Sequence, residues 1–355
     1  MLTFFGFCYY YLIPFRSLFS VLYIWAVGRY FLSKPSISVI DFVLVTFLII
    51  KLYLESLNVG IIAALLYLRL YWGFFFFYLY FKKKTFDFFN IACVFAFFTC
   101  LEFVLIHTVP QYVVLLPNYS QPEVISEYIQ ASGLFAGAYG FGGNRTVTGT
   151  ILLASYVYYQ RRDSKQKYLL LFGSIFAVSG VALGLLFLVL LAQSSNLAKV
   201  TMNKIMLGGF GAVFFLWFVS GDNPIFYRFS LKYLFEFIYQ YKIDQIKEAL
   251  DIIGNWGWKM FFGHHSFSSE NVAVDGYGLH FGDFSMLEFF VQYGLLGLAL
   301  LFILVASKQT LRTRTALFVL LAGTFHYHII FSLPGQIFLG YLLAQKKPKL
   351  KLFEK

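Results

Sequence analysis

Apolar residues occupy long runs along the chain, and short polar connectors separate these runs. Runs of about 18 or more apolar residues can cross the hydrocarbon core of a bilayer as helices. The pattern predicts an all-α, polytopic membrane protein, a single integral-membrane domain over residues 1–355 with about 12 transmembrane helices. The predicted apolar segments are residues 2–15, 17–32, 37–56, 60–81, 86–108, 144–160, 167–179, 180–193, 204–220, 284–306, 314–332 and 335–345.

The composition agrees with this class and excludes others. Hydrophobic residues make up 59% of the chain, aromatic residues 22% and charged residues only 13%, a balance that ordinary soluble domains do not show. The net charge of +11 could indicate a nucleic-acid partner, but the lysines and arginines cluster beside the apolar runs. We therefore interpret the charge as a signal of membrane orientation and expect no nucleic-acid partner.

The basic connectors predict the orientation. If the spans alternate, most of the lysines and arginines fall on one side, which the positive-inside rule makes the cytoplasm, together with both termini. The run 167–193 could form one span or two short ones. Two short spans keep the connector 308–314 and the basic C-terminal tail cytoplasmic, so we favour two. This choice places two long loops, residues 110–144 and 221–283, on the outer, periplasmic side.

The larger outer loop is rich in ionisable residues. Residues 229–253 within it carry apolar side chains at helical spacing with charges between them, which predicts interfacial helices on the membrane surface. Arg228, Lys242 and Lys247 belong to this region. Each could simply be solvated or touch lipid headgroups, but together they form a basic patch that suits an anionic ligand such as a diphosphate.

Basic residues at or inside the spans are further candidates. Arg145 follows a glycine-rich segment at the outer end of a span. It could be an interfacial anchor, or it could clamp phosphate oxygens that free N–H groups at the helix start also bind. Arg69 lies about nine residues inside its span, where a lone charge is costly, so we expect it to face the bundle interior or a water-filled cavity. Lys51 lies nearer a span end, and we expect its amine to reach the interface.

The end of the larger loop offers a proton acceptor. His280 and Asp283 immediately precede an apolar run, so either could act as a general base at the outer membrane face. Asp283 could equally cap the helix that follows. Glu288, one turn further in, could orient a basic partner or face the bundle. His264 and His265 have no matching metal ligands nearby, and we expect neither a metal nor a cofactor.

The order of these features resembles the bacterial O-antigen polymerases (Wzy) and O-antigen ligases. A glycine-rich segment, 142–145 (Gly-Gly-Asn-Arg), stands at an outer span end, and 179–183 (Ser-Gly-Val-Ala-Leu) is similar to a family turn between spans. Residues 283–287 (Asp-Phe-Ser-Met-Leu), followed by 294–297 (Gly-Leu-Leu-Gly), keep the spacing of the family's loop-end motif. The likeness extends over most of residues 60–310.

The chain departs from the family pattern at individual positions. Asp283 fills the position of the ligases' histidine, and His280 lies one turn upstream. Gly180 stands where the family's turn has an arginine, and Lys242 aligns best with a later loop arginine. The missing histidine favours the polymerase over the ligase.

The resemblance implies a glycosyltransferase of the bacterial inner membrane. Such an enzyme transfers a glycan from undecaprenyl diphosphate to the sugar of another lipid-linked repeat unit at the periplasmic face, and so builds O-antigen for lipopolysaccharide or a related surface polysaccharide. Its implied partners are the undecaprenyl-diphosphate-linked oligosaccharide, the lipid bilayer and, as a further candidate, the polysaccharide chain-length regulator. The implied diphosphate-binding residues are Arg69, Arg145, Arg228 and Lys242, the implied bases are His280 and Asp283, and the supporting residues are Lys247 and Glu288.

Two alternatives stay open. An O-antigen ligase would transfer the finished glycan to lipid A core. A lipid-linked oligosaccharide flippase is a transporter of a different class, and it also has about twelve spans and interior arginines. Flippases tend to have short loops and an internal repeat, and this chain shows neither feature.

Overall fold

A computed structural model describes most of the hydrophobic segments of the chain. The described residues are 20–32, 38–82, 87–109, 136–193, 208–209, 211, 243–244, 246–247, 250, 257, 259–263, 285–307 and 311–345. Within these ranges all regular structure is helical and there is no strand, which confirms the predicted all-α class. The predicted span 2–15, nearly all of 204–220 and most of both outer loops lie outside the described residues.

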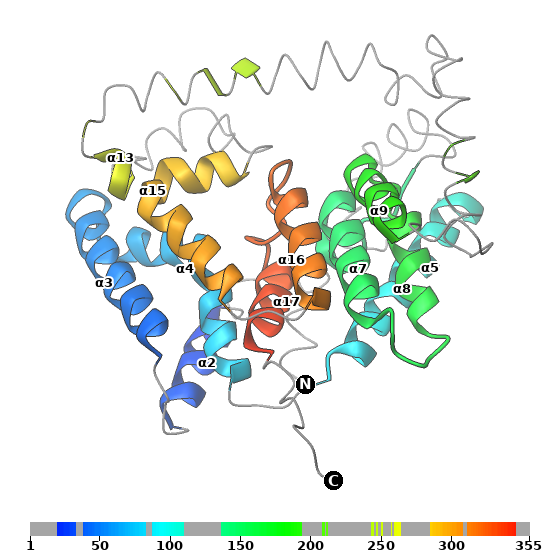
Figure 1. Ribbon diagram of the computed structural model, residues 1–355, viewed down its shortest axis with the longest axis horizontal. Helices are drawn as coiled ribbons and strands as arrows, with labels where there is room; N and C mark the ends of the chain where they lie inside the picture. Colours follow the sequence, from blue (N-terminus) through cyan, green and yellow to red (C-terminus); the bar gives the residue numbers. More distant parts are fainter. Residues whose placement is uncertain are drawn as a thin grey trace.

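The helices follow the predicted apolar segments closely (Figure 1). They are α2 (Ser20–Leu32), α3 (Val39–Val59), α4 (Ile61–Lys82), α5 (Phe89–Thr108), the 3-10 helix η5 (Gly140–Gly142), α7 (Arg145–Tyr159), α8 (Lys167–Phe176), α9 (Gly180–Gln193), α13 (Lys259–Phe262), α15 (Ser285–Ala306), α16 (Leu311–Thr324) and α17 (Leu333–Ala344).

Local polar residues define several helix ends. Ser38 and Asp41 form a capping box at the start of α3, in which each side chain accepts a hydrogen bond from the other residue's backbone N–H. Asn144 caps α7 by accepting from Thr146 N at 2.8 Å. Such caps satisfy N–H groups that have no partner within the helix.

The run 167–193 is broken into two helices, as the sequence predicts. Helix α8 ends at Phe176, Val178 adopts a positive φ of 46°, and α9 begins at Gly180. The backbone N–H of Ala138 donates to the carbonyl of Phe176 at 3.0 Å, so the segment before α7 takes up one of the carbonyls freed at the end of α8.

Helix α15 is not the continuous span that the sequence predicts. Gly294 interrupts it with φ 65° and ψ −169°. A Cβ at this position would lie 2.5 Å from Gly263 N and from Phe261 O, so the close approach of the segment 259–263 requires glycine. In Figure 1 the first part of α15 runs across the upper end of the bundle and the second part descends into it.

The predicted span 314–332 also differs from the structure. Helix α16 ends at Thr324, residues 325–332 form turns, and α17 begins after Ser332, whose Oγ accepts from Gly335 N at 3.2 Å. Every residue of α17 is buried, as expected for a helix that is apolar on all sides. It packs closely on α4, where a Cβ at Gly340 would lie 2.7 Å from the carbonyl oxygen of Phe74.

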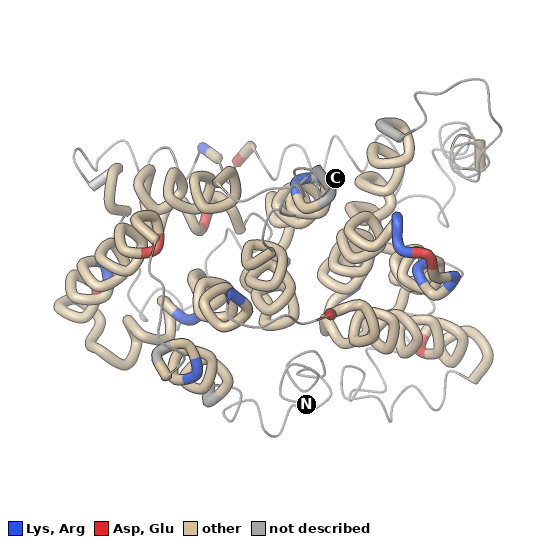
Figure 2. Tube along the Cα trace, turned by 60° about the horizontal axis from the view of Figure 1, so that its bottom comes forward, with Lys and Arg blue, Asp and Glu red and all other residues tan. Residues whose placement is uncertain are grey.

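The outer surface of the bundle is apolar. On α3, Phe42, Ile49, Tyr53 and Leu57 are all exposed, although such a continuous apolar face is unfavourable in water. Figure 2 shows how few charged residues the helices carry. By length and composition, α4, α5 and α15 could each cross a membrane, and shorter apolar helices accompany them. These are the helices of a membrane protein.

Basic connectors gather at one end of the bundle. Arg162, just after α7, forms an ion pair with Asp87 at 2.6 Å, and its guanidinium carbon lies 4.2 Å from the ring centre of Phe89. Phe89 in turn contacts Tyr159, with ring centroids 5.1 Å apart. The start of α5 and the end of α7 therefore lie together, and Arg145, at the first residue of α7, lies toward the opposite end.

Candidate functional site

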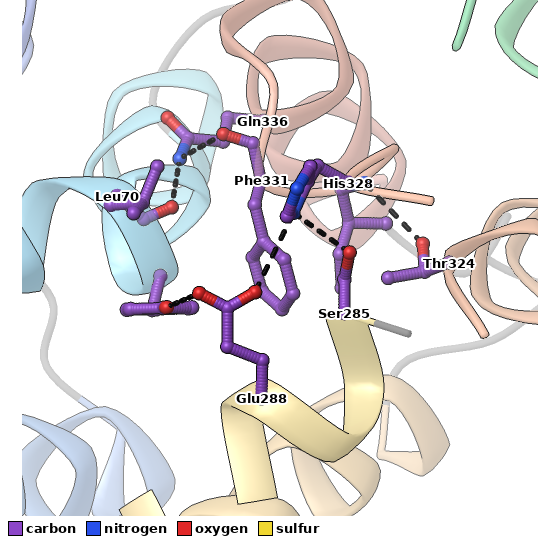
Figure 3. A network of polar contacts seen from close by, with 9 residues as sticks. Leu70, Ser285, Glu288, Thr324, His328, Phe331 and Gln336 are labelled. Carbon is purple, nitrogen blue, oxygen red and sulfur yellow. Dashed lines mark hydrogen bonds and ion pairs between the residues drawn. The ribbon is translucent and has the colours of Figure 1, made fainter. Parts of the chain in front are cut away.

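A buried polar cluster lies at the start of α15 (Figure 3), and we call it the Glu288 cluster. It comprises Tyr71 from the middle of α4, Ser285 and Glu288 from the first turn of α15, and His328 from the turns between α16 and α17. Tyr71 and Ser285 are fully buried and Glu288 is 7% exposed. The His328 side chain remains 38% exposed, so the cluster has one member that a substrate can reach.

The contacts within the cluster converge on Glu288 and His328. The Tyr71 hydroxyl donates a hydrogen bond to Glu288 Oε1. His328 Nδ1 lies 2.8 Å from Ser285 Oγ and 3.7 Å from Glu288 Oε2. Oε2 itself is shielded from solvent and has no hydrogen-bond partner among the described residues. One carboxylate oxygen is thus held in place while the other faces the imidazole.

The turns that carry His328 are fixed by side-chain hydrogen bonds. Ile330 N donates to Thr324 Oγ1 at 3.3 Å. Gln336 Nε2 donates to the carbonyl of Phe331 at 3.1 Å and to the carbonyl of Leu70 on α4 at 2.6 Å. Because these bonds satisfy a buried non-helical backbone, they fix the connection between α16 and α17, and with it the position of the imidazole.

The other buried carboxylates each accept hydrogen bonds from nearby side chains or backbone groups. Lys82 Nζ lies 2.5 Å from Asp41 Oδ2, and Tyr78 donates to Asp41 Oδ1 at 2.9 Å. The remaining two, Glu55 and Glu102, are described below. Within the described residues only Glu288 has a solvent-shielded carboxylate oxygen without a hydrogen bond. Such an atom is costly, and at a functional site it marks a place for a partner.

Contrary to the expectation from its position near a span end, Lys51 does not reach the interface. It is 1% exposed and pairs with Glu55, one turn along α3, at 3.3 Å. Its Nζ also donates to the carbonyl of Phe262 at 3.1 Å, and Gln292 donates to Glu55 Oε1 at 2.7 Å. The charge is buried because a carboxylate and a carbonyl compensate it. This network holds the segment 259–263 against α3 and α15.

Side chains of α5 and α7 bind the backbone N–H groups of the glycine-rich segment before α7. Glu102, at 2% exposure, accepts from the N–H groups of Tyr139 at 2.6 Å and Gly140 at 3.1 Å. Gly142 N donates to Thr148 Oγ1 at 3.1 Å. These three N–H groups are therefore engaged within the protein, and the hypothesis that N–H groups at the start of α7 bind a phosphate stays a prediction. Arg145, the first residue of α7, is half-buried.

The predicted site residues are distributed over separate regions. Arg69 is half-buried on α4, with its guanidinium carbon 6.0 Å from the ring centre of Tyr23. Lys247 is exposed, and its Nζ lies 3.7 Å from Asp244. Glu288 faces the bundle beside a basic partner, as its position predicts. The predicted residues outside the described part are Arg228, Lys242, His280 and Asp283.

The structure does not bring Arg145 to Glu288. Figure 1 shows α16 and α17 between α7, which begins at Arg145, and α15, which carries Glu288. The two predicted functional groups therefore lie in different halves of the bundle.

His328, Ser285 and Tyr71 are not among the site residues predicted from the sequence. A signal was present for His328, because a histidine inside a predicted span is a functional candidate by default. Ser285 and Tyr71 carry no comparable signal, since only the tertiary fold brings them to the imidazole.

The arrangement is suited to proton transfer. Among the described residues no group of three or more His, Cys, Asp or Glu side chains is placed to hold a metal ion. An accessible imidazole beside a buried carboxylate can accept a proton, because the carboxylate stabilises the imidazolium that forms. Comparison with protein-family models, curated proteins and solved structures finds no match for this chain.

Proposed function

We propose that this protein is an integral membrane glycosyltransferase of the O-antigen polymerase type. It would transfer a glycan from undecaprenyl diphosphate to a sugar hydroxyl of a second lipid-linked repeat unit at the periplasmic face of the bacterial inner membrane. The observation that carries the proposal is the Glu288 cluster, a proton-accepting group at the start of the helix whose sequence resembles the polymerase and ligase motif.

The chemistry needs a base, cations and an apolar wall. A base removes the proton of the attacking hydroxyl, and cations stabilise the charge that develops on the leaving diphosphate. The candidate cations of the described part are Arg69 and Arg145; Arg228 and Lys242 complete the predicted set, with Lys247 in support. The aromatic side chains of the bundle offer an apolar surface that a polyprenyl chain can contact.

The proposed topology has about 12 spans, both termini in the cytoplasm and the loops 110–144 and 221–283 in the periplasm. The orientation is supported by the ends of α4 and α7, which carry Lys82 and precede Arg162, because both ends lie toward the same end of the bundle. Figure 1 places the first half of α15 at the opposite end. The base and the acceptor sugar would then meet at the outer surface.

The test is an assay with purified protein in lipid nanodiscs and a synthetic undecaprenyl-diphosphate-linked repeat unit. We expect a ladder of lipid-linked chains that differ by whole repeat units, resolved by gel electrophoresis or mass spectrometry. Transfer to lipid A core without chain growth would instead identify a ligase. Recovery of unchanged substrate, with and without an added lipid A core acceptor, would contradict a transferase of either kind.

A flippase is the second candidate, because the Lys51–Glu55 pair lies inside the bundle next to the break at Gly294. Ionisable side chains and interrupted helices at membrane depth are features of transporters. Proteoliposomes loaded with a fluorescent lipid-linked oligosaccharide distinguish the two functions. Protein-dependent movement of the lipid between leaflets without any new glycosidic bond would favour the flippase.

A further inference from the structure

We propose that His328 is the general base that activates the acceptor sugar, and that Ser285 and Glu288 orient its imidazole. This inference rests on the proposed glycosyltransferase function and names the residue that removes the proton. It assigns the base to the connection between α16 and α17, whereas the candidates predicted from the sequence are His280 and Asp283.

The two nitrogens of His328 have different surroundings. Nδ1 faces the protein, 2.8 Å from Ser285 Oγ and 3.7 Å from Glu288 Oε2. Nε2 has no polar partner among the described residues, and the side chain is 38% exposed. With the Nδ1 proton directed to Ser285 and Glu288, Nε2 carries the lone pair and points away from these buried partners. This is the nitrogen that an incoming hydroxyl can reach.

The geometry differs from that of a serine nucleophile with its activating histidine. In such a triad the serine and the carboxylate contact opposite nitrogens of the imidazole. Here Ser285 and Glu288 approach the same nitrogen, and Ser285 is completely buried. Ser285 is therefore a positioning residue, and the reaction that the cluster supports is proton removal from a bound substrate.

Glu288 is placed to respond to the charge on the ring. Its Oε1 is held by the Tyr71 hydroxyl, and its Oε2 has no other hydrogen bond among the described residues. When Nε2 gains a proton, the imidazolium lies beside a carboxylate that is itself shielded from solvent, and a shielded charge attracts its partner more strongly than one in water. The carboxylate thus stabilises the protonated state that forms during the reaction.

The step balances without any further reactant. The acceptor hydroxyl gives its proton to His328 Nε2 while its oxygen forms a bond to the anomeric carbon of the donor glycan. The bond between that carbon and the diphosphate oxygen breaks, and the electron pair leaves with the polyprenyl diphosphate. His328 then releases the proton to the departing diphosphate or to water, which restores the neutral imidazole.

The experiment compares three variants in the nanodisc assay with the lipid-linked repeat unit. His328→Ala removes the base, and His328→Asn removes Nε2 while its amide can still bond Ser285. His326→Ala, two residues earlier in the same turns, is the matched control. We expect both His328 variants to lose about 10²–10⁴-fold in turnover, the usual contribution of a positioned base, and His326→Ala to keep wild-type turnover.

Added imidazole separates a chemical role from a structural one. We expect imidazole to restore part of the activity of His328→Ala and to leave the wild type unchanged. Wild-type turnover in His328→Asn would overturn the assignment, and so would an inactive but folded His328→Ala that imidazole does not rescue at any concentration. If the wild-type protein itself forms no glycosidic bond, the proposed function fails and the assignment of the base fails with it.

Discussion

The glycine-rich segment before α7 and the start of α15 each surround a buried carboxylate, but the two carboxylates are used differently. Glu102 accepts hydrogen bonds from two consecutive backbone N–H groups, and both of its oxygens are engaged. Glu288 accepts from Tyr71 with one oxygen and keeps the other beside His328. Burial of the charged group costs free energy in both places, and only at Glu102 do backbone hydrogen bonds compensate it fully.

We interpret Glu102 as a structural carboxylate and propose Glu288 as a functional one. A carboxylate with both oxygens hydrogen-bonded, as at Glu102, has no acceptor left to respond to a substrate. Glu288 Oε2, which has no hydrogen bond among the described residues, can respond when the accessible imidazole of His328 becomes charged, although an unpaired buried oxygen lowers stability. Substitutions of Glu55, Glu102, Glu288 or their partners should therefore affect stability and activity in different proportions, and we order them from the largest expected loss of stability to the smallest.

The largest loss of stability is expected for Lys51→Met. This change leaves Glu55 charged and buried, with only Gln292 as a partner. Removing one member of a buried ion pair typically costs about 3–5 kcal/mol. We expect a decrease of that size in the free energy of unfolding, measured by denaturant titration in detergent micelles.

The control is the double variant Lys51→Met/Glu55→Gln. Both variants lose the hydrogen bond to the Phe262 carbonyl. The difference between their free energies of unfolding therefore reports only the cost of a buried carboxylate without its lysine. We expect the double variant to recover most of the loss, because replacing both members of a buried pair is often nearly neutral. Equal stability of the single and double variants would show that Lys51 does not compensate a buried charge on Glu55.

A smaller loss is expected for Glu102→Gln. The amide oxygen can keep both donors, as Oε1 does now, but the NH2 group replaces Oε2, the second acceptor of Gly140 N, and places a donor against that N–H. Loss of one buried hydrogen bond costs about 1–3 kcal/mol. Thermal unfolding followed by intrinsic fluorescence would measure it. An unchanged midpoint would mean that Glu102 does not hold the segment before α7.

The sequence predicts the helices well, because long apolar runs have few alternatives inside a bilayer. It does not predict the break at Gly294, since the glycine is needed for a contact with residues 259–263 that are distant in sequence. It also fails at Lys51. The carboxylate of Glu55 lies one turn away on the same helix, and this i, i+4 spacing was a visible sign of a buried pair.

The candidate site could be predicted only in part. Glu288 is recognisable as a charged residue in the first turn of an apolar helix, and the structure gives it the basic neighbour that this position suggests. The neighbour is His328, which lies in a segment that the pattern assigns to a span. Residues 325–332 form turns, although the hydrophobic pattern predicts a helix there. The contact between the imidazole and α15 depends on these turns and could not be predicted from the pattern.

The most direct test compares Glu288→Gln with Glu102→Gln in the nanodisc assay, with turnover expressed per folded molecule. The Glu288→Gln amide can still accept from Tyr71, so we expect its unfolding midpoint to stay close to that of the wild type. Its turnover should fall by about 10²-fold, because a neutral amide no longer stabilises the imidazolium. Glu102→Gln should unfold earlier and keep its turnover. Full turnover in folded Glu288→Gln would contradict the assignment of this cluster to the chemistry.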